Sequence, residues 1–321
     1  MNDRECIGSP WFGRCCPRIG SATCGTPGEP CRGPGRPFIA HGVSRKAASN
    51  NYNNRKGGKY AASWKSGPEP SIPANNPYNE EIGRHWLQMA EGEHASIASF
   101  ARFTLQLMSL GSPSGLLVAS QKAEMDEINH AKYAYAFASA FLGSNYGPGS
   151  LDVKGTLDDV SLEYTVRSLI QEGCIGETIS AIEAHVAAHY SQDSVIKTAM
   201  IQIASDETRH AQLAWDCLRW IIETFPEALI FAQDTFKSEL KQRFKLNNYD
   251  VSMNSDEACE KNNCESGRDD FFRKSGIILQ QDKDKANKVG IQNIIAPVYH
   301  SGFEDVSLIS KKILELKVDC L

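Results

Sequence analysis

Polar and apolar residues recur with the period of an α-helix along two stretches of the chain, 79–111 and 114–142. In the first stretch, apolar side chains return mostly every three or four residues until Gly111-Ser112-Pro113 interrupts the pattern. In the second, apolar residues follow one stripe up to Gly143, a residue type favoured just after the last turn of a helix. The spacing therefore predicts two long amphipathic helices joined by a short link.

The same period returns further along the chain. It predicts a third helix from about 157 to 190 and a fourth from about 191–194 to 225, before Pro226. No stretch of 79–245 alternates with period two for long enough to predict a strand. The pattern predicts an all-α fold, a four-helix bundle whose second and third helices are joined by a crossover of about 14 residues, 143–156.

The segments on either side of the bundle differ from it in composition. Residues 1–37 are rich in Gly, Pro and Cys, and 43–76 are polar and basic without a sustained period. We expect an irregular arm followed by a linker that is either ordered against the bundle or disordered. After the bundle, 227–246 has the pattern of a fifth helix, 254–270 that of a polar loop and 307–317 that of a short helix. The expected domains are an N-terminal arm and linker over 1–78, the helical bundle over 79–245 and a C-terminal extension over 246–321.

The composition excludes several classes of function. The chain has 321 residues, enough to bury a sizeable core in one or two domains. Its 39 acidic and 34 basic side chains give a formal net charge of -5, so no overall basic field favours binding to nucleic acid or to anionic lipid. No uncharged apolar run reaches about 18 residues, and no apolar core of a secretory signal is visible near residue 1. We expect neither a nucleic-acid partner nor a membrane span.

The cysteines are placed unevenly. Five of the ten lie in the first 31 residues, and no C-x-x-C occurs, which disfavours a rubredoxin-type or zinc-ribbon site. We expect disulfides that fasten the arm and the tail to the bundle. Such clustering favours an oxidising compartment, as in a secreted protein, although reduced or metal-binding cysteines inside a cell are the alternative.

One motif occurs twice, each time in the middle of a predicted helix. Residues 126–134 and 206–214 both read D-E-x-x-H-A-x-x-A, and the copies are 80 residues apart (206 − 126). Five identical residues at identical spacing indicate a duplicated helix pair rather than chance. Because Glu and His three positions apart lie on one helix face, each copy presents a carboxylate and an imidazole from adjacent turns.

A weaker echo precedes each copy of the motif. Glu93 lies 34 residues before Glu127 (127 − 93), and Glu177 lies 30 before Glu207 (207 − 177), each directly after a glycine. In antiparallel helices joined by a tight link, such separations bring both positions to the same level of a bundle. Glu172 competes with Glu177 because it lies 35 residues before Glu207 (207 − 172). We predict Glu177 as the ligand and Glu172 as a residue behind the ligands or an alternative ligand.

Four glutamates and two histidines would then meet in the middle of the bundle. Four carboxylates do not stay ionised in an apolar core without compensation, whereas two divalent cations balance their charge. A Glu from each of two helices and a Glu-x-x-His from each of the other two is the ligand set of carboxylate-bridged di-iron and di-manganese bundles. The predicted metal ligands are Glu93, Glu127, His130, Glu177, Glu207 and His210.

The Asp before each motif glutamate adds a further expectation. A metal-bound imidazole usually donates its other N–H to a carboxylate. With two helix pairs related by a pseudo-twofold axis, Asp126 should reach His210 and Asp206 should reach His130. The alternative is that both Asp residues are solvated helix charges.

The segment 79–225 resembles the ferritin-like superfamily of dimetal-carboxylate proteins, through its paired D-E-x-x-H motifs and the two preceding glutamates. The resemblance implies two Fe ions, or alternatively two Mn ions, that activate dioxygen to oxidise a small organic substrate, with an electron donor as partner. It also implies that the four glutamates that bind the metals take part in catalysis: Glu93, Glu127, Glu177 and Glu207.

Two other functions stay open. The first is ferroxidase or peroxide-scavenging activity, including that of a di-manganese catalase, and the second is a structural or binding module stabilised by its metals. The chain also departs from some members of the superfamily. It lacks the C-x-x-C pairs of rubrerythrin-like proteins, and its long flanking segments would obstruct the assembly of a storage cage.

Overall fold

Long helices account for most of the structure, as the apolar spacing predicts. The computed structural model describes residues 36–53, 63–246 and 267–316, which are mostly helical with little strand, and this confirms the all-α class. The longer helices are α2 (Asn79–Ser109), α3 (Ser114–Leu142), α5 (Thr178–Tyr190), α6 (Ser194–Thr224) and α7 (Ala228–Leu246). The shorter ones are α4 (Leu162–Ser168), η1 (Leu169–Glu177), α8 (Gly267–Lys274), α9 (Gln280–Gly290), η2 (Ile291–Ile295), α10 (Ala296–His300), η3 (Val306–Leu308) and α11 (Ile309–Leu314).

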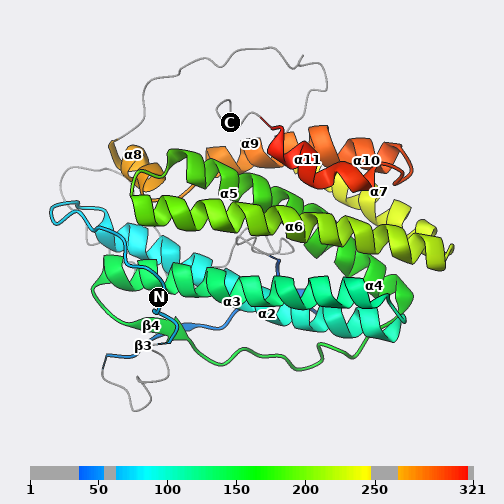
Figure 1. The fold of residues 1–321 in the computed structure, drawn as a ribbon, viewed down its shortest axis with the longest axis horizontal. Helices are drawn as coiled ribbons and strands as arrows, with labels where there is room; N and C mark the ends of the chain where they lie inside the picture. Colours follow the sequence, from blue (N-terminus) through cyan, green and yellow to red (C-terminus); the bar gives the residue numbers. More distant parts are fainter. Residues whose placement is uncertain (1–35, 54–62, 247–266, 317–321) are drawn as a thin grey trace, which may run out of the picture. The chain divides into compact units, whose positions relative to one another are not determined.

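Helices α2 and α3 form a hairpin and pack on each other along their length (Figure 1). Their bounds agree with the predicted ones to within two residues. Gly143 follows α3 in the left-handed conformation, with a φ of 61°, where a residue without a side chain is favoured. Near the same end, a Cβ atom on Gly83 would lie 2.6 Å from Cγ of Leu142, so the two helices approach closely there.

The second helix pair contains a π-helical segment. α4, η1 and α5 form one continuous helix over 162–190, and the link 191–193 leads into α6 (Figure 1). The continuous helix begins later than the predicted position near 157 because Ser161 caps it, its Oγ accepting a hydrogen bond from the backbone N–H of Tyr164 at 3.3 Å. Asp193 caps α6 in the same way. The two pairs meet mainly through α3 and α6.

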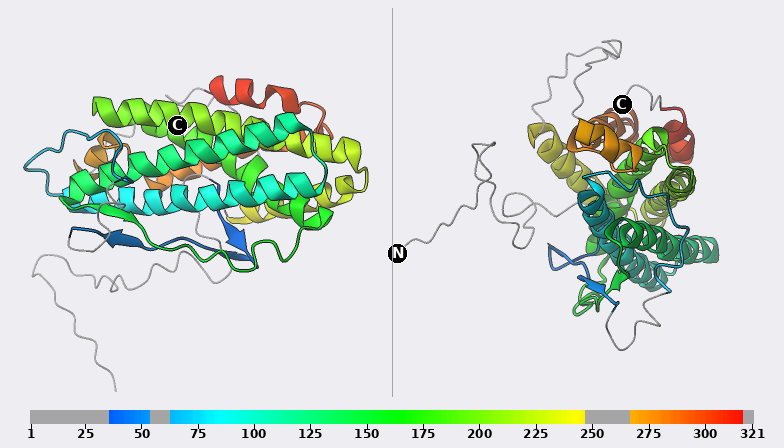
Figure 2. Two further views of the ribbon diagram at one scale, coloured as in Figure 1. Left: turned by 60° about the horizontal axis from the view of Figure 1, so that its bottom comes forward. Right: turned by 90° about the vertical axis from the view of Figure 1, so that its left-hand side faces the viewer.

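Short strands lie in the crossover and in the segment before α2. β1 (Ile39–Ala40) pairs antiparallel with β2 (Val43–Ser44), and β3 (Ser49–Asn51) pairs antiparallel with β4 (Tyr146–Pro148). β4 belongs to the crossover, which runs along the outside of α2 and α3 (Figure 2). The apolar pattern did not predict these strands, because segments of two or three residues are too short to show a period.

The C-terminal extension packs against the second helix pair. α9 contacts α5, while η3 and α11 contact α6. The loop after α8 reaches α2, where the indole Nε1 of Trp86 donates a hydrogen bond to the carbonyl oxygen of Ser275 at 3.1 Å. Of the helices after α7, the sequence predicted only the last. The predicted loop over 254–270 lies mostly outside the described residues, and its last four residues begin α8.

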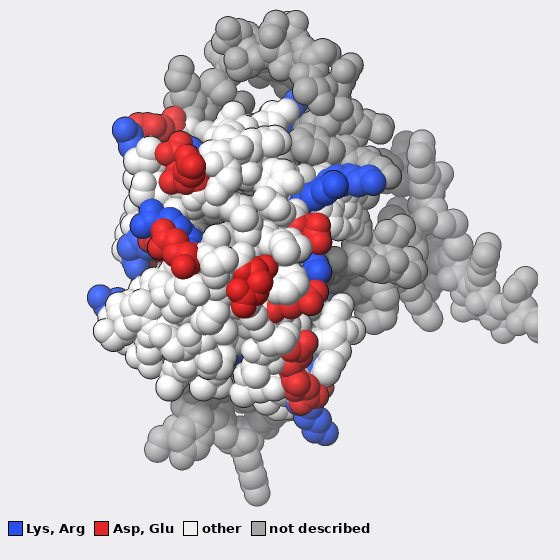
Figure 3. Space-filling model, turned by 90° about the vertical axis from the view of Figure 1, so that its right-hand side faces the viewer, with Lys and Arg blue, Asp and Glu red and all other residues white. Residues whose placement is uncertain are grey.

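The surface gives no sign of a large charged field on the face shown in Figure 3, where acidic and basic side chains are interspersed. Among the described residues, no helix combines the length and the apolar composition needed to cross a membrane.

The cysteines that prompted the disulfide prediction lie outside the described residues. Within them, Cys174 and Cys217 are buried free thiols, one on η1 and one on α6. Both therefore act as small apolar side chains of the core.

Candidate metal centre

The two copies of the repeated motif face each other between α3 and α6. α3 carries Glu127 and His130, α6 carries Glu207 and His210, and all four side chains are buried. Nδ1 of His130 lies 3.7 Å from Oε2 of Glu127 and 3.5 Å from Oε1 of Glu207. Nδ1 of His210 lies 3.2 Å from Oε1 of Glu127 and 3.9 Å from Oε2 of Glu207. Each motif glutamate therefore lies beside both imidazoles.

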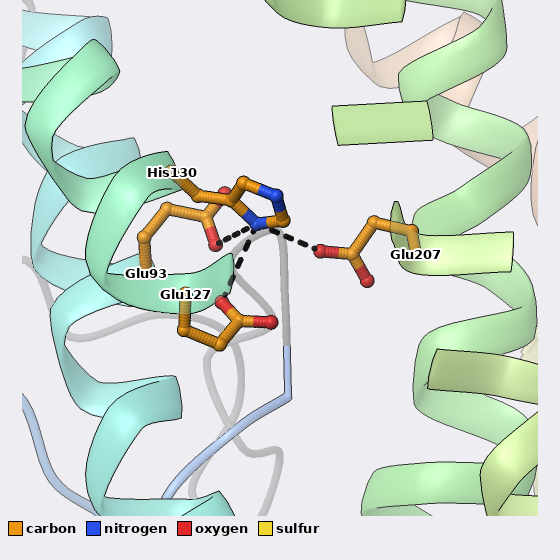
Figure 4. A group of neighbouring side chains, drawn as sticks. All are labelled: Glu93, Glu127, His130 and Glu207. Atoms are coloured by element: carbon orange, nitrogen blue, oxygen red, sulfur yellow. Dashed lines mark ion pairs between the residues drawn. The ribbon is translucent and has the colours of Figure 1, made fainter. Parts of the chain in front are cut away.

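Glu93 of α2 and Glu177 at the end of η1 complete the arrangement. In Figure 4, Glu93 and both motif glutamates turn toward the ring of His130. The six side chains form two overlapping groups that share Glu127 and Glu207, so they could hold two adjacent cations. Within each group all ligand atoms lie within 4.8 Å of one another: Glu93, Glu127, His130 and Glu207 in the first, and Glu127, Glu177, Glu207 and His210 in the second.

The ligand atoms of these side chains lack the hydrogen bonds that buried polar groups usually make. A buried oxygen or nitrogen without a partner costs free energy, so a cluster of them needs another source of stabilisation. Their convergence fits a pair of cations. The buried atoms without a hydrogen-bond partner are both carboxylate oxygens of Glu127, Glu177 and Glu207, one oxygen of Glu93, and Nδ1 of His130 and His210.

The electrostatics of the cluster also favours cations. Burial, reinforced by a neighbouring glutamate, raises the pKa of Glu93 and Glu177 well above the usual range and that of Glu207 to about 7. Burial acts in the same direction on Glu127, but the imidazoles of His130 and His210 outweigh it and hold the pKa of Glu127 below its ordinary value. Without added positive charge, the four carboxylates are not all ionised near neutral pH.

Each histidine is oriented by an aspartate from the opposite motif. Nε2 of His130 lies 3.2 Å from Oδ2 of Asp206, and Nε2 of His210 lies 3.3 Å from Oδ2 of Asp126. This is the crossed pairing expected from the pseudo-twofold arrangement. It leaves Nδ1 of each ring directed at the glutamates, which is the orientation in which that nitrogen could bind a metal.

Glu172 lies apart from the six ligand side chains. Its Oε2 accepts a hydrogen bond from Oγ of Ser99 at 3.0 Å, pairs with the guanidinium of Arg102, and lies 3.6 Å from Nε of Arg36. Glu177, five residues later, faces the motif glutamates. In a π-helix the hydrogen bonds run from i to i+5, so residues five apart lie on nearly the same side. The π-helical turn of η1 thus explains how Glu172 and Glu177 are both buried. Glu177 lies in the cluster of glutamates and histidines, whereas Glu172 pairs with arginines.

Sequence reasoning missed the arginines around the site. Arg209 lies 3.2 Å from Oδ2 of Asp126 and also pairs with Asp206, so one guanidinium joins the two aspartates. It stands three residues after Asp206, a spacing that signals an ion pair on a helix. Arg36 and Arg102 gave no such signal, because their partner Glu172 is distant in sequence.

Comparisons with models of protein families, with curated proteins and with solved structures found no match for this chain.

Proposed function

We propose that the protein binds two metal ions, two Fe ions in the first instance, and uses them to activate dioxygen for the oxidation of a small organic substrate. The observation that carries this proposal is the convergence of four buried glutamates and two buried histidines whose ligand atoms have no hydrogen-bond partners. Carboxylates shared by two iron ions, together with imidazoles that each bind one ion, are the ligands of di-iron sites of this kind.

We further propose that the helices form a ferritin-like four-helix bundle. In support, α2 packs on α3, the continuous helix of η1 and α5 packs on α6, and α3 contacts α6. The second and third long helices are joined by the crossover 143–161 rather than by a tight link. Each pair contributes one Glu and one Glu-x-x-His, as the duplicated sequence motif requires.

When bound by these six side chains, two Fe(II) ions would supply electrons to dioxygen, while the protein controls the surroundings. The six ligand side chains are almost fully buried, which excludes bulk water from the reaction and strengthens electrostatic interactions inside the site. Asp126 and Asp206 contact Nε2 of the two histidines and would keep each ring in one orientation, with Nδ1 toward the metals.

The direct test is to load the full chain with Fe(II) in the absence of oxygen and then to admit oxygen while recording optical spectra. We expect an oxygen-dependent absorption band that the variant Glu127→Gln does not produce. A metal-loaded protein whose spectrum does not respond to oxygen would contradict the proposal. Rapid turnover of excess Fe(II) or of peroxide, without an organic substrate, would favour ferroxidase, catalase or peroxide-scavenging activity instead.

A further inference from the structure

The two cation positions have different surroundings. We refer to the position of Glu93 and His130 as the first position and to that of Glu177 and His210 as the second; Glu127 and Glu207 belong to both. The duplicated motif makes their ligands alike, so a difference in cation affinity must come from the groups behind the ligands.

A buried arginine lies beside the second position. The guanidinium carbon of Arg36 lies 4.2 Å from the centre of the Phe103 ring and 4.9 Å from that of Phe100. The Phe100 ring in turn packs edge-on against the ring of His210, with centroids 5.1 Å apart. The side chain of Arg36 is 1% exposed, and its Nε and Nη2 make no hydrogen bond to the part of the chain that the structure describes. Water therefore screens its charge little.

Among residues 36–53, 63–246 and 267–316, the contacts of Arg36 leave an excess of positive charge. Within these ranges, Glu172 is the carboxylate in contact with both Arg36 and Arg102, so one negative charge faces two positive ones. After Glu172, Glu177 of the second position is the carboxyl group that acts most on the charge of Arg36. A cation bound at the second position would be repelled by the excess positive charge of this cluster.

The aspartates that contact the two histidines also favour the first position, because Asp206 is less exposed and has more partners than Asp126. Asp206, which orients His130, is 5% exposed, accepts a hydrogen bond from Nε2 of Gln202 at 2.8 Å and pairs with Arg209. Asp126, which orients His210, is 22% exposed and pairs with Arg209. Because Arg209 touches both aspartates, its charge acts on both. The firmer support of Asp206 leaves His130 the better oriented ligand.

From these surroundings we propose that the two positions bind cations unequally, that the first fills before the second, and that Arg36 sets this order. The inference rests on the proposed function, since it requires that the six side chains bind a metal pair. Its consequence is that limiting metal gives chains with a single cation at the first position, rather than a mixture of empty and fully loaded chains.

The test is an anaerobic titration of the metal-free full chain with Mn(II), followed by electron paramagnetic resonance. Isolated bound Mn(II) and spin-coupled Mn(II) pairs give different spectra. At one equivalent of metal we expect isolated bound Mn(II) to predominate, with pairs formed by the second equivalent and binding constants that differ by about tenfold or more. A substantial share of coupled pairs at one equivalent would overturn the proposed order.

Two variants change the charge in opposite directions. Arg36→Met removes the positive charge while keeping an unbranched side chain. We expect the association constant of Mn(II) for the second position to rise toward that for the first. Glu172→Gln removes the counter-charge, and we expect the second constant to fall further. Arg36→Lys keeps the charge and should keep the order. Circular dichroism shows whether Arg36→Met and Glu172→Gln fold. If either folded variant binds Mn(II) with the association constants of the wild-type chain, Arg36 does not set the order.

The titration separates this inference from the proposed function. If the wild-type chain binds no Mn(II) and no Fe(II), the proposed function fails and the order fails with it. If it binds two cations with equal constants or as pairs only, the metal site stands and only the order is wrong.

Discussion

Glu127 and Glu207 are the residues on which both proposed cation positions would depend, because each belongs to both groups of side chains that could hold a metal. A bridging carboxylate holds two cations at once and balances part of the charge of each. A change at Glu127 should therefore affect the whole site, whereas a change at Glu93 or Glu177 touches one position directly.

The first prediction concerns this bridging role. Glu127→Gln keeps the size of the side chain but removes a negative charge, so we expect bound metal to fall from about two ions to fewer than one per chain. The matched control is Glu124→Gln on the same helix, whose side chain is partly exposed and lies outside the cluster. Elemental analysis of both purified variants measures the difference; equal metal contents in the two would refute the bridging role.

A second prediction concerns Asp206. Asp206→Asn weakens the hold on His130 without removing a ligand, so we expect cation affinity to fall by about 10- to 100-fold while the helical content is unchanged. Asp216→Asn is the control, because Asp216 lies on the same helix and pairs with Gln212 instead. Calorimetric titration with Mn(II) measures both affinities. An effect of equal size in the control would mean that Asp206 acts only through the stability of α6.

The third prediction concerns pH. Because the pKa values of Glu93, Glu177 and Glu207 are raised in the metal-free protein, raising the pH ionises carboxyls that the fold holds neutral and destabilises the metal-free chain. Cation binding requires the ionised forms, so it strengthens over the same range. The rise in melting temperature on adding Mn(II) should grow from about pH 6 to about pH 8. A rise that shrinks with pH would contradict the assignment of these carboxylates as ligands.

At the scale of elements, the long helices, the tight link after α2 and the crossover after α3 were predictable, whereas the short strands and most of the C-terminal helices were not. α2 and α3 have one apolar stripe and clear stop signals, so the period of their sequence predicts both ends. The helix from 280 was missed because QQDKDKANKVG is almost entirely polar and is stabilised by packing on α5 rather than by its own pattern. The short strands depend on pairing between segments far apart in the sequence.

The site was predictable to the extent that its residues repeat. The duplicated motif and its spacing pointed to the six residues that the structure brings together. The choice between Glu172 and Glu177 depended on a π-helical turn, which has no reliable sequence signal, and on two arginines that a sequence alone does not place. In our proposal, the charge of these arginines makes the second cation position bind more weakly than the first.

A fourth prediction tests the packing of the π-helical segment. A Cβ atom on Gly173 would lie 2.8 Å from Cβ of Ala214 on α6, so Gly173→Ala requires the two helices to move apart. We expect the free energy of unfolding to fall by about 1–3 kcal/mol. Gly115→Ala on α3 is the control, since nothing lies within 4 Å of its Cβ position, and it should be neutral or slightly stabilising. Chemical denaturation measures both; equal effects would contradict the close approach.

At the scale of the whole molecule, the described segments outside the two helix pairs support the site from several directions. The segment from Arg36 to Ala40 lies against α2, where Oγ of Ser96 donates a hydrogen bond to the carbonyl oxygen of Arg36 at 2.9 Å. The C-terminal helices cover α5 and α6. These segments and the helix pairs thus surround six buried side chains that have carboxylate oxygens or imidazole nitrogens without a hydrogen-bond partner among the described residues.

The most direct test of this account is anomalous X-ray diffraction from crystals of the full chain loaded with Fe(II) or Mn(II), recorded on both sides of the metal absorption edge. We predict two anomalous peaks between α3 and α6, each within bonding distance of one histidine and three glutamates, with Glu127 and Glu207 shared. The absence of peaks there, or metal bound only at surface carboxylates, would contradict the central claim.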